Sequence, residues 1–144
     1  MGSLRFYFSL LAAKTAYRAL QLTRLSAGTS IIGRYVLKLC PDFLKQCNPY
    51  ISTKINVTGT NGKTTTSGLI THLIKESGKS VINNAMGANM LTGVVNAVAV
   101  SLNPCEQTDF SVIESDEAYL AKIYDQFDAD YLIVTNLFLS LIHI

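Results

Sequence analysis

The chain has 144 residues, which is enough for one domain with an apolar core but too few for two full-sized α/β domains. Hydrophobic residues make up 49% of the sequence and charged residues 15%, a balance that excludes a disordered chain. The net charge is only +2 and no basic cluster with interleaved aromatic residues stands out, so we expect no nucleic acid partner.

The three cysteines, Cys40, Cys47 and Cys105, predict a reduced compartment. Their number is odd and none are spaced as Cys-x-x-Cys, so neither a disulfide framework nor a zinc site is indicated. No apolar run reaches the roughly 18 uninterrupted residues that a spanning helix needs. We therefore expect a cytoplasmic protein.

Apolar residues recur at helical spacing between residues 4 and 25 and predict an N-terminal amphipathic helix. The apolar stripe consists of Leu4, Phe8, Leu11, Ala19 and Leu22, whereas Lys14, Arg18 and Gln21 share another face. Two roles fit this helix: packing on the adjacent domain, or a membrane-surface role as in other basic amphipathic helices. A cleaved signal peptide is disfavoured, because Lys14 interrupts the apolar run and the helical pattern continues past it.

A connector with a short helical segment is predicted next, over residues 26–44, with Gly28 and Gly33 at turns and Pro41 starting a short helix or turn. From residue 51, short β-rich runs alternate with helical ones. The expected strands are 54–58, 80–83, 110–114 and 130–135, and the expected helices are 63–77, 90–102 and 116–126, with Gly78 as a helix cap. This alternation predicts an α/β fold with a parallel sheet that binds ligands at the carboxyl ends of its strands.

The first of these strands runs into the stretch GTNGKTT, residues 59–65, which predicts a phosphate-binding loop. The usual pattern of Gly, four residues and Gly-Lys-Ser/Thr fails here, because Val57 stands five positions before Gly62. A loop shorter by two residues stands instead, made of Gly59, Thr60, Asn61, Gly62 and Lys63. Its backbone N–H groups and the following helix N-terminus suit a phosphate.

Two side-chain roles follow from this loop. Lys63 is expected to reach the outer phosphates, and the hydroxyl of Thr64 or Thr65 to bind Mg²⁺ beside them. The plainer alternative is a glycine turn between a strand and a helix, with an incidental lysine.

A carboxylate is expected at the same sheet edge, where the strand 110–114 ends in Glu114. A carboxylate in that position can bind Mg²⁺ directly or through water. Asp116 and Glu117 compete for this role, but they also suit the first turn of the following helix, where negative charge is favourable.

These residues resemble those of a known superfamily, the Mur ligases and folylpolyglutamate synthetases, which are ATP-dependent ligases that form amide bonds through an acyl phosphate. Within it the chain is most similar to the MurT family, the ligase subunits of lipid II isoglutaminyl synthases. The resemblance covers residues 4–138 and lies in the connector and in the motifs VTGTNGKTTT, NNAMGANML, IESDEAYL and VTNLF. It implies an N-terminal helical segment and connector over residues 1–50, and part of the central ATP-binding domain over residues 51–138.

The resemblance also implies a reaction. ATP would phosphorylate the α-carboxylate of D-glutamate in the lipid II stem peptide, and ammonia from a GatD-like glutaminase would attack the acyl phosphate. Lys63 and Glu114 would be catalytic, with Mg²⁺ held by Thr64 and Glu114. Asn84 and Asn89 would be polar contacts near the nucleotide or acceptor, or else turn residues after the second strand. A lipid-linked substrate would place the enzyme at the inner face of the cell membrane.

The last six residues, LSLIHI at 139–144, depart from the family pattern and resemble the translation of a sequencing adaptor. We expect them to be a non-native tail on a truncated frame; the alternative is a genuine strand extension. His143 is expected to be incidental. The family's cysteine-rich zinc-binding insertion and C-terminal domain would then be missing, and we expect the chain alone to bind nucleotide weakly and to be inactive.

Two other functions remain open. An amino-acid-adding Mur ligase, or a folylpolyglutamate synthetase-like enzyme, would share the same loop; a full precursor-binding domain upstream would favour the former. A nucleotide-binding module without catalysis would bind ATP tightly on its own.

Overall fold

Four parallel strands form the centre of the fold, in the order β2-β3-β1-β4. The computed structural model describes residues 2–22, 29–84 and 89–136. The strands are β1 (Ile51–Thr58), β2 (Val81–Asn83), β3 (Thr108–Glu114) and β4 (Tyr131–Val134). The helices are α1 (Leu4–Leu22), α2 (Thr29–Leu39), α3 (Phe43–Cys47), α4 (Lys63–Glu76), α5 (Leu91–Ser101) and α6 (Glu117–Tyr124), with a 3₁₀ turn, η2 (Asn48–Tyr50), before β1. The predicted α/β fold with a parallel sheet is confirmed, and the N-terminal helix is present.

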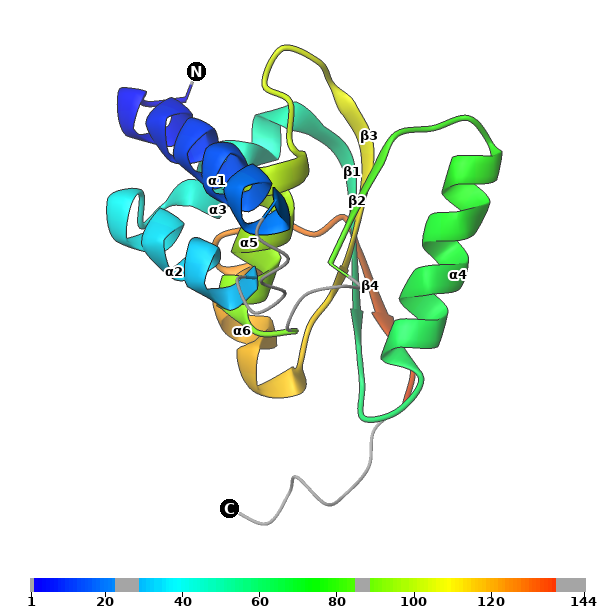
Figure 1. Cartoon of the computed structure of the whole chain (residues 1–144). Helices are drawn as coiled ribbons and strands as arrows, with labels where there is room; N and C mark the ends of the chain where they lie inside the picture. Colours follow the sequence, from blue (N-terminus) through cyan, green and yellow to red (C-terminus); the bar gives the residue numbers. More distant parts are fainter. Residues whose placement is uncertain (1, 23–28, 85–88, 137–144) are drawn as a thin grey trace.

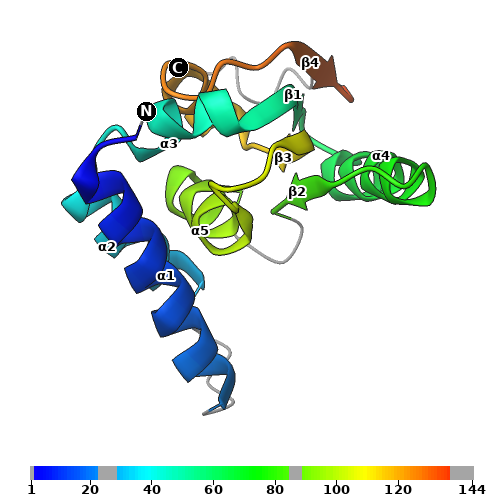
Figure 2. The same cartoon turned by 90° about the horizontal axis from the view of Figure 1, so that it is seen from above.

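Helices cover both faces of this sheet (Figure 1). α4 packs on one face, and α5 lies on the other with α6 beside it. α1 and α2 lie outside α5 and form an outer layer on the side away from α4 (Figure 2). The buried apolar core fills the space between α5, the sheet and this outer layer. Gly78, the residue at which a helix cap was expected, follows the end of α4 and has a φ of +76°.

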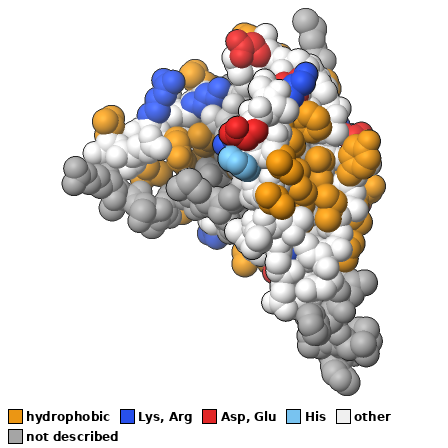
Figure 3. All heavy atoms as spheres, turned by 90° about the vertical axis from the view of Figure 1, so that its right-hand side faces the viewer, with side chains coloured by type: hydrophobic (Ala, Val, Ile, Leu, Met, Phe, Trp, Pro, Cys, Tyr) orange, Lys and Arg blue, Asp and Glu red, His pale blue; other side chains and the backbone are white. Residues whose placement is uncertain are grey.

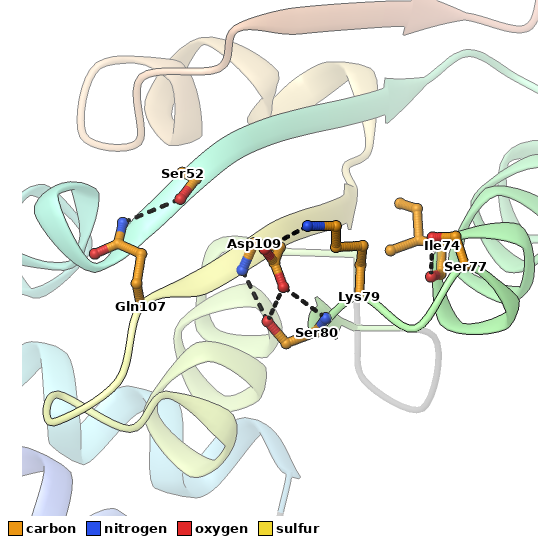
Figure 4. Close-up of polar contacts among 7 residues, drawn as sticks. All are labelled: Ser52, Ile74, Ser77, Lys79, Ser80, Gln107 and Asp109. Carbon is orange, nitrogen blue, oxygen red and sulfur yellow. Dashed lines mark hydrogen bonds and ion pairs between the residues drawn. The ribbon is translucent and has the colours of Figure 1, made fainter.

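Hydrogen bonds at the amino-terminal edge of the sheet align β2 with β3 (Figure 4). Asp109 accepts hydrogen bonds from the backbone N–H and the hydroxyl of Ser80, at 2.9 and 2.8 Å, and lies 3.5 Å from the ammonium of Lys79. The backbone N–H of Asp109 donates back to the Ser80 hydroxyl at 2.8 Å. These bonds lie one residue before the paired residues Val81 and Phe110, and they support the register of β2 against β3.

Asp130 makes a similar connection between β1 and the start of β4. Its carboxylate accepts from the backbone N–H of Lys54 at 2.7 Å and lies 3.5 Å from the Lys54 ammonium. Hydrogen bonding by the Lys54 backbone lowers the pKa of Asp130, and the lysine charge acts in the same direction. Both ends of the β1–β4 pair are therefore held by polar contacts, since Thr135 N–H donates to Thr58 O at the other end.

α1 docks through a face that the sequence pattern did not indicate. Phe6 is fully buried, with its ring centroid 5.3 Å from that of Phe43 and 5.7 Å from that of Tyr50. Leu10 and Ala13 continue this buried face. The stripe of Leu4, Phe8, Leu11 and Leu22 points to solvent instead. The predicted helix therefore does pack on the adjacent domain, but through its aromatic side, because the helix is apolar on both sides.

Gly33 lies inside α2 and not at a turn, which corrects the predicted connector. A Cβ on Gly33 would overlap the carbonyl oxygen of Thr92 and lie 2.8 Å from its carbonyl carbon and 3.2 Å from the backbone nitrogen of Asn96. The glycine therefore permits α2 to cross α5 at close range. Gly28 lies outside the described residues.

We predict that Gly33→Ala lowers the free energy of unfolding by about 3 kcal/mol, because the helix backbones must separate to admit the methyl group. Gly68→Ala is the matched control in α4, where a Cβ meets nothing within 4 Å. It should raise stability by about 0.5–1 kcal/mol, since alanine is the better helix former. Urea unfolding followed by circular dichroism compares the two. Equal effects of both substitutions would contradict the close crossing.

Candidate phosphate-binding site

The loop between β1 and α4 has the conformation that its two glycines allow. Gly59 has φ of +126° and Gly62 has φ of +82°, backbone angles that residues with a side chain rarely adopt. α4 begins directly after the second glycine, at Lys63, so its N-terminus faces the loop. The first backbone N–H groups of α4, which have no intrahelical partner, and the helix dipole therefore meet at the loop, which suits an anion.

Lys63 folds back over the loop. Its ammonium donates to the backbone carbonyls of Gly59 and Thr60, the latter at 3.2 Å. The lysine charge thus lies directly against the loop that is expected to hold phosphate. A phosphate bound there would replace these carbonyl partners with stronger, charge-assisted ones.

Thr64 and Glu114 are far apart in the sequence but adjacent in the structure. The Thr64 hydroxyl donates to the Glu114 carboxylate at 3.1 Å, joining the first turn of α4 to the end of β3. Both Thr64 and Thr65 are exposed on this turn, and it is the Thr64 hydroxyl that the structure places against the carboxylate. The pair that the sequence predicted for Mg²⁺ is therefore adjacent.

The Glu114 carboxylate has surroundings that fit a cation. The residue Glu114 is 8% exposed, and no lysine or arginine in the described segments forms an ion pair with its carboxylate. A buried carboxylate without a positive partner is costly, so an added cation would be favoured there. Two oxygen ligands plus phosphate oxygens are the donor set that Mg²⁺ prefers.

The described segments contain no cluster of three or more His, Cys, Asp or Glu side chains that could hold a metal ion by themselves. Cys40 and Cys47 are buried and Cys105 is exposed, all as free thiols. Burial raises the pKa of the Cys40 thiol to about 11, and burial likewise raises the pKa of Cys47. Both thiols stay protonated at neutral pH, which disfavours metal binding.

Asn84 positions Glu114 from the neighbouring strand. Its side-chain amide donates to the Glu114 carbonyl at 2.8 Å, and its amide oxygen accepts from the Glu114 N–H at 2.7 Å. Asn84 is 2% exposed, so the geometry gives it a supporting role beneath the carboxylate. Its role as a nucleotide contact stays a prediction.

Asn89 is half-buried after the second strand, and its backbone carbonyl accepts from the N–H of Asp116 at 3.1 Å. The intervening Gly87 and Ala88 of the same motif lie outside the described residues, as do residues 137–144 with His143 and the predicted tail. A nucleotide contact by Asn89 therefore also stays a prediction.

Glu117 contacts the loop as well as starting α6. The Thr60 hydroxyl donates to its carboxylate at 3.2 Å. A hydrogen bond from its own backbone N–H lowers the pKa of Glu117, and the Thr60 hydroxyl and the Lys63 charge act in the same direction. The sequence indicated a helix-start role or competition for the metal; the contact with Thr60 depends on the β1–β3 pairing, which no local pattern reveals.

The end of β4 clamps the loop from the other side, through two residues that sequence reasoning missed. The Asn136 amide oxygen accepts from the backbone N–H groups of both Thr60 and Asn61, each at 3.0 Å. The Thr135 hydroxyl donates to the carbonyl of Asn61 at 2.7 Å. A Cβ on Gly59 would overlap the Thr135 hydroxyl and lie 2.8 Å from the Asn136 carbonyl oxygen, so only glycine admits this contact.

Comparison with known proteins identifies a family. The Mur ligase middle domain matches residues 57–138, more than half of the chain. The chain is 33% identical over 77% of its length to the lipid II isoglutaminyl synthase (glutamine-hydrolyzing) subunit MurT of Staphylococcus aureus, and 32% identical over 94% to that of Streptococcus pneumoniae. It is 36% identical over 58% of its length to a UDP-N-acetylmuramoylalanine–D-glutamate ligase of Christiangramia forsetii. The chain spans 25–30% of the two MurT relatives and 17% of the third.

We predict that Asn136→Ala loosens the loop without unfolding the domain. Losing two hydrogen bonds of about 1 kcal/mol each should speed amide exchange at Thr60 and Asn61 by roughly fivefold or more. Asn103→Ala is the matched control, because the Asn103 side chain accepts from a backbone N–H, that of Cys105, in another loop. Hydrogen exchange by NMR measures both. Unchanged exchange at Thr60 and Asn61 in Asn136→Ala would refute the clamp.

Proposed function

Because the chain belongs to the Mur ligase family, with part of the middle domain in residues 57–138, we propose that it carries the ATP-binding part of a ligase of peptidoglycan synthesis. The observation that supports this most directly is the contact of the Thr64 hydroxyl with the buried Glu114 carboxylate, beside the loop of Gly59 to Lys63. Loop, hydroxyl and carboxylate together form the arrangement that holds a nucleoside triphosphate with Mg²⁺.

Each residue has a distinct part in this proposal. The backbone N–H groups at the α4 N-terminus, beside the loop, bind the phosphates. Lys63 moves from the loop carbonyls to the phosphate oxygens and neutralises charge on the transferred group. Thr64 and Glu114 would hold Mg²⁺, which supplies further neutralisation of the phosphate charge when bound. Asn84 keeps the Glu114 backbone in place throughout.

We further propose that the full protein amidates a lipid-linked peptide. Two relatives are named as MurT subunits of lipid II isoglutaminyl synthase. By extension, the acceptor would be the D-glutamate α-carboxylate of lipid II, activated as an acyl phosphate and then attacked by ammonia from a GatD-like glutaminase. The C. forsetii relative is named as an amino-acid-adding ligase and supports the alternative acceptor chemistry.

The location proposed is the cytoplasm, at the inner face of the membrane, where a lipid-linked substrate would be reached. Among the helices that the structure describes, none is both long enough and apolar enough to cross a bilayer. Any contact with the membrane by these helices would therefore be made at its surface.

We predict that Glu114→Gln weakens binding of Mg·ATP at least about tenfold, because a neutral amide replaces a charged metal ligand. Binding of ATP in excess EDTA should change much less. Glu106→Gln is the matched control, since Glu106 is exposed in the loop before β3. Isothermal titration calorimetry of both variants, with and without Mg²⁺, decides the matter. Equal Mg·ATP affinities of Glu114→Gln and the unaltered chain would contradict a metal role for Glu114.

The acceptor chemistry is tested with labelled nitrogen. The protein carrying this domain is incubated with lipid II, ATP, a GatD-like glutaminase and glutamine labelled with ¹⁵N in its amide. We expect ¹⁵N in a new carboxamide on D-glutamate, detected by mass spectrometry, and none when Lys63→Ala is introduced. Incorporation of an added amino acid in place of ¹⁵N would support the amino-acid-adding alternative.

A further inference from the structure

Positive charge is concentrated at one end of this chain. Residues 1–41 contain six Lys or Arg and no Asp or Glu, a net charge of +6. Residues 42–144 contain six Lys or Arg and ten Asp or Glu, a net charge of −4. The small total of +2 therefore includes a strongly basic N-terminal segment, and this segment contains α1 and α2.

The outer face of α1 is unusually apolar for a surface helix. Leu4, Leu11 and Leu22 are 87%, 63% and 86% exposed. They repeat at a spacing that keeps them on one side, opposite the face that Phe6 and Leu10 bury. A helix that packs through one apolar face and exposes a second apolar face to solvent is typical of a site that binds a partner or a membrane.

α2 presents a mixed outer face of the same character. Ile31 and Tyr35 are exposed on it, and Arg34 and Lys38 are exposed beside them. Ile32 and Val36 on the inner face are buried and pack toward α5. The inner face therefore packs α2 onto the domain, and the exposed apolar side chains are not needed for that packing.

The two helices together form one surface. α1 and α2 pack against each other in the outer layer, on the opposite side of the sheet from α4 (Figure 2). A cavity of about 370 Å³ lies between them, lined by Arg5 and Phe8 of α1 and by Lys38 and Leu39 of α2. Two cations beside two apolar side chains match the junction of a lipid phosphate with its acyl chains.

We propose that the outer faces of α1 and α2 form a docking surface for an anionic lipid bilayer. The apolar side chains enter the interface between headgroups and acyl chains, while the Arg and Lys stems extend alongside them and bring their charges to lipid phosphates. Charge complementarity selects this occupant: the N-terminal segment has a net charge of +6, contains no acidic residue and supplies the exposed Arg34 and Lys38, so it is attracted to anionic headgroups. Docking would also hold the proposed ligase beside a lipid-linked substrate, a consequence that rests on the function proposed above.

A second exposed apolar area lies on the α4 side of the molecule (Figure 3). Viewed from the α4 side, the molecule shows hydrophobic side chains gathered in one area (Figure 3), and Leu69, Leu73 and Tyr131 are exposed on α4 and β4. The exposed side chains of α4 include His72, Lys75 and Glu76, of mixed charge, so no charge complementarity identifies a partner for that area.

The test is vesicle co-sedimentation of the 144-residue chain without nucleotide. Vesicles of phosphatidylcholine with 30% phosphatidylglycerol are compared with vesicles of phosphatidylcholine alone. We expect binding to the anionic vesicles only, weakening as salt is raised. Arg34→Glu with Lys38→Glu should reduce the partition coefficient roughly 30-fold or more, since each basic residue contributes about fivefold. Phe8→Ser with Leu11→Ser should reduce it on the same vesicles, by loss of apolar burial.

Lys75→Glu with Lys122→Glu is the matched control, because both lysines are exposed on other helices and the change in net charge is identical. Circular dichroism confirms that each variant is folded. No binding to anionic vesicles, or equal losses in the two double charge reversals, would overturn the proposal. So would self-association of the chain through these faces in place of vesicle binding. Because nucleotide is absent, either result leaves the Mg·ATP test of the proposed function independent.

Discussion

The parallel pairing of β1 with β3 is the constraint on which the site depends. It sets Val57 opposite Glu114, so the carboxylate lies at the level where β1 turns into the phosphate loop. A shift of one residue would turn Glu114 to the other face of the sheet and separate it from Thr64. Asp109 at one end of β3 and Asn84 at the other hold β2 and β3 in matching alignment.

Much of the fold could be predicted because the sheet is parallel and buried. Such strands appear as short apolar runs between helical ones, and every predicted strand and helix from residue 51 onward has a counterpart within a few residues. The loop and its lysine were equally visible, since glycines and Lys63 are adjacent in sequence. Glu114 could be predicted from strand polarity alone, because the carboxyl ends of parallel strands share an edge.

What could not be predicted depends on contacts between distant segments. Asn136 reaches the loop across 76 residues of sequence, and no periodicity shows that β4 inserts beside β1. The docking face of α1 was missed for a different reason: both of its faces are apolar, so spacing alone cannot show which one packs. Gly33 was expected at a turn, whereas its lack of a side chain serves a helix crossing.

The strand order also determines when the loop can become ordered during synthesis. β1 is made first but lies between β3 and β4, which are made later. Thr60 and Asn61 of the loop are held by Glu117, Thr135 and Asn136, which follow the loop residue that each contacts by at least 57 positions. The ribosome must therefore release the chain through residue 136 before the nucleotide site can form. Until then, β1 of the nascent chain has no neighbouring strand, and only α4 or chaperones can shield its apolar side chains from water.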